Sequence, residues 1–545
     1  MPPYYVGNRN SFANFVRYDT KKRILFDMHG ILNWKQTLYA LLACLLIACS
    51  GGNEKPELPV VPDEPEAVIP QPEKIDTLKL ETVEFKDIQV EGKSIVVKYQ
   101  ASGSVTVKCG DVWIKEASTN SNQTNQKTFT VAANGGNERT TQITFALGKL
   151  SEKVTVSQLG CEPVKEGEGY AWDIAKKLGL GWNIGNQLDA YNNGVADETC
   201  WGNQAATQQT FDKVAEAGFT SVRIPVTWMG HIGEAPDYQI EDAWLNRVAE
   251  LVAYAENAKL NAIINMHHDG ADSDYWLSIK RASASEEANE EIKNQLKAMW
   301  TQIATKFKDK GEFLIFESMN EIHDGGWGWG ANLNDNGKQY AIMNEWNQVF
   351  VDAVRAVGGE NVNRYLGIPG YCANVDLTLN HMALPADEAQ NRLLVAVHFY
   401  DPYEYTLNNK YTEWGYTASS NKKDSWGDED NVKKVFGQLR DHYVNQGVPV
   451  YIGEMGCVHR NSTRAEKFRK YYLEYVCKAA RSYGLAPFYW DNGAKGTGQE
   501  CSGLFDHATG EYLNNAEEVL AVMKKAIMND EADYTLNTVY DEAPR

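Results

Sequence analysis

The sequence predicts an α/β protein, a (β/α)8 TIM barrel that is preceded by a small all-β sandwich domain. Eight short apolar strands alternate with helical stretches over about 350 residues, which is the pattern of such a barrel. About 80 residues upstream alternate between apolar and polar side chains with a period of two, as in a sandwich. Polar side chains follow nearly every apolar strand of the larger region, where barrel enzymes keep their chemistry.

Residues 1–49 have the pattern of a secretory leader. Every residue of 38–48 is apolar or aromatic, a run too short to cross a bilayer but suited to a signal peptide. The run ends in Leu-Ile-Ala-Cys49, which resembles a bacterial lipobox, so Cys49 is expected to carry the lipid of the mature protein. Residues 1–27 precede a signal that could begin at Met28, and they suggest an over-long start. The competing interpretation is an ordinary buried apolar segment.

Residues 50–76 form a linker rich in proline and glutamate. Six prolines fall between residues 56 and 72, among acidic side chains and almost no aromatics. Such a segment buries too little surface to fold, and proline keeps it extended. Together with the leader, it predicts a lipoprotein of the cell envelope. Its resemblance to Bacteroidetes lipoproteins implies a place in the outer membrane, exposed at the cell surface.

The sandwich is expected over residues 77–161. Its alternating runs are 83–86, 95–98, 105–108, 129–131, 143–145 and 154–156. The run around Trp113 and the closing Val-Ser-Gln-Leu159 resemble the BACON domain, which accompanies glycoside hydrolases in Bacteroidetes lipoproteins. Two roles stay open, a spacer without ligand affinity and a glycan-binding module, and the spacer is favoured.

The barrel is expected over residues 166–530, followed by a C-terminal tail at 531–545. Its strands are predicted at 179–186, 221–228, 261–268, 313–321, 365–371, 393–400, 448–455 and 486–493. Its helices are predicted at 207–217, 243–258, 286–307, 339–357, 432–445, 464–483 and 515–527, and the connection at 378–388 has the weakest helical pattern. A doubly wound open sheet is the alternative, but it requires a glycine-rich phosphate loop that 181–186 does not provide.

Composition narrows the class of partner. The chain has 53 basic and 73 acidic side chains, a net charge of −20 that argues against nucleic acid or an anionic membrane surface as the main partner. Fifteen Trp and 28 Tyr are compatible with sugar binding and equally with an aromatic core. The seven cysteines downstream of Cys49 lack zinc spacing and are odd in number, so we expect no metal, no cofactor and no disulfide scaffold. The protein is expected to act as a monomer.

The ends of the predicted strands carry a dense set of polar groups. They are Asn186, Arg223, His267, His268, Asn320, Glu321, His398, Tyr400, Glu454 and Trp490. A single glutamate at a strand end is more often part of a loop salt bridge, but polar groups at nearly every strand end favour an active site.

At these residues the sequence resembles glycoside hydrolase family 5, from about residue 170 to 526. The matching motifs span 223–228 (Arg-Ile-Pro-Val-Thr-Trp), 265–269 (Asn-Met-His-His-Asp), 319–321 (Met-Asn-Glu), 398–400 (His-Phe-Tyr), 452–454 (Ile-Gly-Glu) and 489–491 (Tyr-Trp-Asp). Residues 181–190 and 200–203 resemble its subfamily 4, mostly endoglucanases and xyloglucanases. Gln187, Gln204 and Ile322 depart from the usual Thr, Pro and Pro.

The resemblance implies a retaining hydrolase with Glu321 as acid/base and Glu454 as nucleophile, their carboxylates about 5 Å apart. Arg223 is expected to keep Glu454 ionised, whereas Glu321 must hold a proton near neutrality. By the same resemblance, the side chains with supporting roles are Arg223 and Tyr400 at the nucleophile, Asn320 at the sugar 2-OH, His398 and His267 beside Glu321 or the −1 sugar, Trp490 as its platform, and His268 and Asn186 as further sugar contacts.

A glycine-rich loop at 324–330 carries Trp327 and Trp329, which we expect to stack on sugars at plus subsites. Packing onto neighbouring loops is the alternative for both. Weaker candidates of the same kind are Trp201, Trp276, Trp414 and Trp426.

The expected substrate is a β-1,4-glucan of plant cell walls, namely cellulose, mixed-linkage glucan or xyloglucan. The alternatives are a mannan-directed hydrolase of the same fold and a non-catalytic surface glycan-binding lipoprotein, which would lack Glu321 or Glu454. A metal-dependent barrel hydrolase would need histidines on the first strand, and an aldolase a strand-end lysine; neither is present.

Overall fold

The computed structural model describes residues 76–89, 92–111, 113–117, 125–132, 134, 138–159 and 167–545. The leader, the lipidation site Cys49 and the linker up to residue 75 lie outside the described residues, so their assignment stays a prediction. Among the residues that are described, no helix has the length and apolar character needed to cross a membrane.

The N-terminal all-β region consists of two four-stranded sheets, in the orders β1-β3-β6-β5 and β2-β8-β7-β4. Its strands are β1 (Leu78–Leu80), β2 (Glu84–Ile88), β3 (Lys93–Ala101), β4 (Thr106–Cys109), β5 (Ile114–Glu116), β6 (Gln126–Val131), β7 (Arg139–Leu147) and β8 (Leu150–Gln158). Alternate side chains such as Ile95, Val97 and Phe129 form a core between the sheets. All pairs are antiparallel except β2 with β8, which is parallel.

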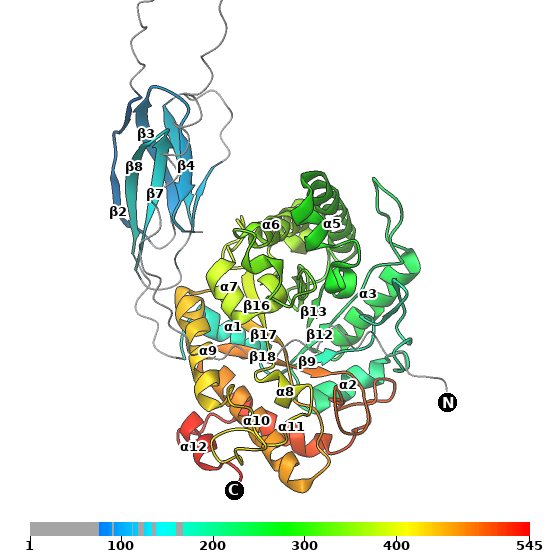
Figure 1. The fold of residues 1–545 in the computed structure, drawn as a ribbon. Coiled ribbons are helices and arrows are strands. Elements are labelled where there is room, and N and C mark those ends of the chain that lie inside the picture. The colour runs from blue at the N-terminus through cyan, green and yellow to red at the C-terminus, as the bar shows by residue number, and fades with distance from the viewer. Residues whose placement is uncertain are drawn as a thin grey trace, which may run out of the picture. The chain divides into compact units, whose positions relative to one another are not determined.

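The second region is a closed barrel of eight parallel strands, in the order β12-β13-β14-β15-β16-β17-β18-β9 (Figure 1). The strands are β9 (Gly181–Ile184), β12 (Ser221–Ile224), β13 (Asn261–Ile264), β14 (Leu314–Glu317), β15 (Leu366–Pro369), β16 (Leu393–Phe399), β17 (Val450–Met455) and β18 (Leu485–Asp491). The predicted (β/α)8 fold is therefore confirmed. A short hairpin, β10 (Tyr191–Asn192) with β11 (Val195–Ala196), follows the first barrel strand.

Helices surround the ring of strands (Figure 1). They are α1 (Tyr170–Leu178), α2 (Gln208–Glu216), α3 (Asp242–Asn257), α4 (Ile279–Ala284), α5 (Glu286–Lys306), α6 (Lys338–Val357), α7 (Val375–His381), α8 (Tyr403–Thr406), α9 (Glu429–His442), α10 (Thr463–Ser482), α11 (Ala516–Met528) and α12 (Leu536–Asp541). Short 3-10 helices lie at His268–Ser273, Ala331–Leu333, Gly359–Val362, Tyr371–Ala373 and Val444–Gln446. The weakly patterned fifth connection contains the seven-residue α7.

The segment 531–545, expected as a tail, contains α12. Tyr534 and Val539 are buried in the same hydrophobic cluster as the barrel helices, so this segment packs as part of the domain.

The barrel interior is built in layers, because alternate residues of each strand point inward. Ile263, Ile315 and Leu394 form an apolar layer together with Ile174 and Leu178 of α1, the helix that precedes the first strand. Two residues further along β14 the inward side chain is Glu317 rather than another apolar one. A polar layer therefore lies directly above an apolar one.

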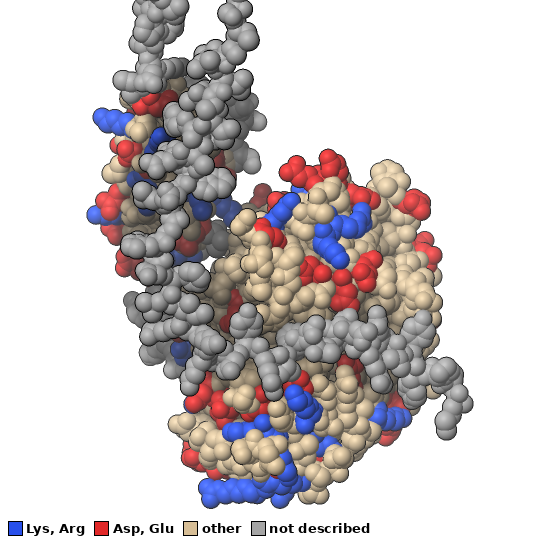
Figure 2. All heavy atoms as spheres, in the orientation of Figure 1, with Lys and Arg blue, Asp and Glu red and all other residues tan. Residues whose placement is uncertain are grey.

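Acidic and basic side chains are intermixed on the face that Figure 2 shows, with uncharged surface between them.

Candidate active site

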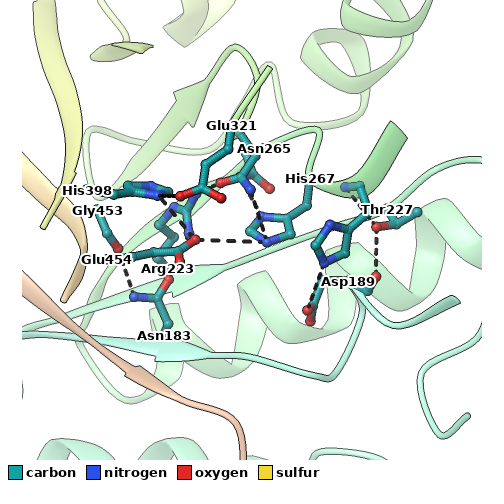
Figure 3. A network of polar contacts seen from close by, with 12 residues as sticks. Asn183, Asp189, Arg223, Thr227, Asn265, His267, Glu321, His398, Gly453 and Glu454 are labelled. Carbon is teal, nitrogen blue, oxygen red and sulfur yellow. Dashed lines mark hydrogen bonds and ion pairs between the residues drawn. The ribbon is translucent and has the colours of Figure 1, made fainter. Parts of the chain in front are cut away.

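A fully buried arginine occupies the centre of the polar layer (Figure 3). Arg223 of β12 donates from Nε and Nη2 to the two oxygens of Glu317, at 3.0 and 2.7 Å. Its Nη1 donates to Glu454 at 2.8 Å and to Asn183 at 3.0 Å, and Nη2 also donates to Asn320 at 2.7 Å. All the donors of the guanidinium are therefore used, as burial of this group requires.

Glu317 receives two further hydrogen bonds. The Tyr451 hydroxyl donates to it at 2.6 Å and the Asn265 amide at 2.9 Å. The charge of Arg223 lowers the pKa of Glu317 against the opposing effect of burial. One cation thus stands between two buried carboxylates, Glu317 and Glu454.

Glu454 lies in β17 beside a bulge of the barrel. His398 of β16 pairs with Glu454 while the preceding residue Val397 pairs with Ile452, so Gly453 is left unpaired. A Cβ at Gly453 would lie 3.2 Å from Nε2 of His398, closer than ordinary packing allows. The glycine and the bulge together bring the His398 ring to 3.8 Å from Glu454. The Tyr400 hydroxyl donates to the other oxygen of Glu454 at 3.2 Å.

Glu321 approaches the same space from the segment that follows β14 (Figure 3). Its carboxylate accepts a hydrogen bond from Nδ1 of His398 at 2.7 Å. One oxygen of Glu321, one of Glu454 and a ring nitrogen of His398 all lie within 4.8 Å of one another. The structure therefore brings together both predicted glutamates, with His398 beside them.

Burial and charge compete at these three groups. Burial raises the pKa of Glu454, although His398 and Arg223 pull it down. Burial also acts to raise the pKa of Glu321, but the charge and hydrogen bond of His398 outweigh it and lower that pKa. Burial acts to lower the pKa of His398, yet the two glutamates raise it. The three groups are therefore coupled: the two carboxylates favour the protonated form of His398, and His398 favours the ionised form of Glu321.

Arg223 does contact Glu454, as the sequence-based expectation requires, and the proton expected on Glu321 stays a prediction. Two further residues act on these groups. Glu317 shares the charge of Arg223, and His398 bonds directly to Glu321.

The remaining predicted residues extend from the carboxylates along one side of the site. The His267 ring lies 3.9 Å from Glu454 and is stacked on Trp490 at a centroid distance of 5.7 Å. The His267 and His268 rings meet edge-on, and His268 lies 3.8 Å from Asp189. Asn186 is further out, on a left-handed backbone with φ of 55°, and its N–H donates to Asp189.

The loop that carries Trp327 and Trp329 is held by one carboxylate. Asp324 accepts backbone N–H groups from Gly326, Ala331 and Asn332. Trp327 is 39% exposed and packs on His323 at 4.2 Å between ring centroids, whereas Trp329 is 69% exposed. Trp329 therefore offers a free aromatic face, and Trp327 offers part of one.

The weaker Trp candidates also differ in their exposure. Trp201 and Trp426 are exposed, and Trp276 is half-buried with its indole N–H donated to Asp269. Trp414 is 2% exposed and packs against the tyrosines of α10, so its expected role as a sugar platform is wrong. The residues around it in the chain are polar, which concealed its burial.

Two groups of side chains in the described part of the chain are close enough to ligate a cation. One is the set Glu321, His398 and Glu454, and the other is Asp189, His267 and His268. Both oxygens of Asp189 also accept backbone N–H groups, from Asn186 and Gln187.

Sequence reasoning missed the residues that support the site from within the barrel. These are Asn183, Asn265, Glu317 and Tyr451. The available signal was an acidic residue inside an otherwise apolar predicted strand, because a buried carboxylate requires a partner of opposite charge.

Comparison with known proteins adds independent findings. Residues 188–496 match the family model for cellulase (glycosyl hydrolase family 5). The chain is 38% identical to Endoglucanase A of Paenibacillus barcinonensis over 343 residues, which are 60% of this chain and 83% of that protein. It is 32% identical to a xyloglucan-specific endo-β-1,4-glucanase of Bacteroides ovatus, over 73% of this chain and 78% of the relative.

Solved structures agree with these matches. A GH5-4 broad specificity endoglucanase from Bacteroides salanitronis is 63% identical, with a TM-score of 0.65 over 68% of this chain and 98% of the other. A Bacteroidetes-affiliated GH5 cellulase linked with a polysaccharide utilization locus is 49% identical, with a TM-score of 0.68 over 70% and 99% of the two chains.

Replacing Arg223 by Met is expected to lower the free energy of unfolding by about 3–5 kcal/mol, since two buried carboxylates lose their cation. The loss should be smaller at about pH 5 than at about pH 8, because the unpaired carboxyls, whose pKa burial then raises, take up protons. Denaturant unfolding at both pH values measures it. The matched control is Arg281→Met, which breaks an exposed pair with Glu291 and should cost less than about 1 kcal/mol. Equal losses for the two variants would contradict this account.

Proposed function

The chain belongs to glycoside hydrolase family 5, and from that membership we propose that it is an endo-acting hydrolase that cleaves β-1,4-glucosidic bonds with retention of configuration. The observation that carries the proposal is the pair of carboxylates, Glu321 and Glu454, with oxygens within 4.8 Å. Retaining glycosidases have carboxyl groups about 5 Å apart, whereas inverting enzymes need a wider gap for a water molecule.

Glu454 is proposed as the nucleophile. Arg223 and Tyr400 each donate to one of its oxygens, which fixes the carboxylate in one orientation. It would attack the anomeric carbon and form a glycosyl-enzyme.

Glu321 is proposed as the acid and then the base. A glucan in the site displaces water from Glu321 and so favours its neutral form, and the proton passes to it from His398 over 2.7 Å. Glu321 then protonates the departing glycosidic oxygen and, in the second step, removes a proton from the attacking water.

Other side chains are proposed to hold the sugar. The Asn320 amide lies beside Arg223, where it can meet the 2-OH of the −1 sugar. Trp490, half-buried and stacked on His267, would form the platform under that sugar. His268 and Asn186 would contact the next sugar outward. The substrate class is the β-1,4-glucans of plant cell walls, in line with the endoglucanases and xyloglucanases among the relatives.

The two glutamates should give opposite products in azide rescue. Glu454→Ala loses the nucleophile and should be nearly inactive; azide entering the vacated space should yield an α-glycosyl azide from an activated β-glycoside. Glu321→Ala can still form the glycosyl-enzyme from a dinitrophenyl glycoside but lacks the base, which is typically worth about 10²–10⁴-fold. Azide should rescue it to the β-glycosyl azide. NMR of the product identifies the anomer, and the same anomer from both variants would refute the role assignment.

Trp329 should contribute to binding of long glucans without contributing to folding. Trp329→Ala is expected to raise KM for soluble glucan on the order of tenfold, the equivalent of about 1.4 kcal/mol. It should leave hydrolysis of β-cellobiosyl fluoride unchanged, because the fluoride leaving group does not fill the plus subsites. The buried Trp414 is the matched control: Trp414→Ala should cost about 3–5 kcal/mol of folding stability. A Trp329→Ala protein with unchanged KM for polymer would exclude the platform role.

The N-terminal part is proposed as an anchor and a spacer. Cys49 would carry lipid in the outer membrane, the linker would extend from it, and the all-β region would be a BACON-like spacer that holds the catalytic barrel at the cell surface. In support, the two sheets of the all-β region enclose a hydrophobic core of their own.

Lipidation at Cys49 is expected to place the full-length protein in the detergent phase, and Cys49→Ala should move it to the aqueous phase. Phase partitioning after expression in a lipoprotein-processing host measures this. Equal partitioning of variant and wild type would refute the anchor.

A protein without residues 1–160 should keep its activity on soluble glucan, since no site residue precedes residue 183.

A further inference from the structure

The geometry points to Glu317 as a positioning residue that holds Arg223 and offsets its charge, so that Glu454 is oriented without being fully neutralised. This inference rests on the proposed role of Glu454 as nucleophile and goes beyond it, because Glu317 lies one layer below the two carboxylates that do the chemistry.

The guanidinium of Arg223 makes more hydrogen bonds to Glu317 than to Glu454. Glu317 binds the edge formed by Nε and Nη2, with three contacts at 2.7 to 3.2 Å, whereas Glu454 accepts a single contact from Nη1 at 2.8 Å. A bidentate carboxylate fixes the plane of an arginine, and a single bond does not. The orientation in which Arg223 meets Glu454 is therefore set by Glu317.

Glu317 is itself held in place and kept ionised. Its oxygens also accept from Tyr451 and Asn265, and its side chain is 1% exposed, so water does not compete for it. The neighbouring guanidinium lowers its pKa below the usual 4.5. Near neutral pH Glu317 is therefore an anion.

The charge balance between Glu317 and Arg223 affects the pKa of Glu454. A buried carboxylate that faced an uncompensated arginine would be strongly stabilised as an ion, with a lowered pKa and a weak tendency to attack carbon. Here burial leaves the pKa of Glu454 above its usual 4.5 in spite of Arg223. The other charged or titratable groups that face Glu454 are Glu321 after β14, His398 in β16, Tyr400 after β16 and His267 after β13.

The test is to measure kcat/KM on 2,4-dinitrophenyl β-cellobioside as a function of pH, over about pH 3.5 to 7. The quantity compared is the acidic limb of this pH profile, where activity falls as the pH falls. This leaving group needs no proton, so the limb reports ionisation of Glu454 in the free enzyme, and activity is lost as pH falls through its pKa. Glu317→Gln keeps the size and one acceptor but removes the charge. It should move the limb about one pH unit lower, since Glu454 then faces the whole charge of Arg223, and should lower kcat at the optimum.

Tyr451→Phe should shift the limb in the opposite direction. The dipole of the Tyr451 hydroxyl partly cancels the field of the Glu317 carboxylate; without it, the negative charge of Glu317 acts more strongly on Arg223 and Glu454. This second variant keeps the inference testable if Glu317→Gln does not fold. An unchanged or lowered limb in Tyr451→Phe, or an unchanged or raised limb in Glu317→Gln, would overturn the inference.

Asp387→Asn is the control that separates a positioning role of Glu317 from a merely structural one. Asp387 also forms a bidentate, largely buried pair with an arginine, Arg355, at 2.7 and 2.8 Å, but it makes no contact with the site. Asp387→Asn should be less stable than the wild type but should have its acidic limb at the same pH. If the acidic limb of this variant also moved, loss of stability alone would explain the shift, and the inference about Glu317 would fail. If the wild type forms no glycosyl-enzyme on Glu454, the proposed function fails; if it does and the limb of Glu317→Gln stays in place, only the role of Glu317 fails.

Discussion

The organisation of the site depends on one buried cation. Arg223 has no contact with solvent, and a guanidinium in that position is stable only if its charge and all its donors are matched. Glu317 and Glu454 match the charge, and Asn183 and Asn320 take the remaining donors. Because these partners come from different strands of the ring, the cation ties together the strands whose positions define the distance between the two glutamates.

The barrel stabilises this arrangement by separating an apolar layer from the polar layer of the site. Apolar side chains and α1 fill the interior next to the start of the strands, so the polar layer above is shielded from water on that side. The bulge at Gly453 then brings His398 between Glu321 and Glu454. Glu454 thus meets the cation Arg223 on one side and His398 on the other, while Glu321 bonds to His398. A change in solvation when a ligand enters can therefore move a proton between His398 and Glu321.

Much of this could be predicted from the sequence because it depends on periodicity and local pattern. The eight strands, the sandwich and the strand-end positions of Glu321 and Glu454 follow from apolar runs that end in polar residues. The function of Glu317 could not be predicted in this way, since its partners Arg223 and Tyr451 are distant in the chain and meet only when the barrel closes. Burial of Trp414 and packing of α12 depend on long-range contacts for the same reason, and the parallel pairing of β2 with β8 is a matter of topology rather than of pattern.

The central claim is that Glu454, held by Arg223, forms a covalent bond to the sugar. The most direct measurement is to trap that species with a 2-deoxy-2-fluoro-β-cellobioside that carries a good leaving group, digest the protein and sequence the labelled peptide by mass spectrometry. The account predicts one added 2-deoxy-2-fluoro-cellobiosyl group, on the peptide that contains Glu454 and at that residue. A label on Glu321, or turnover with inverted configuration and no label, would contradict it.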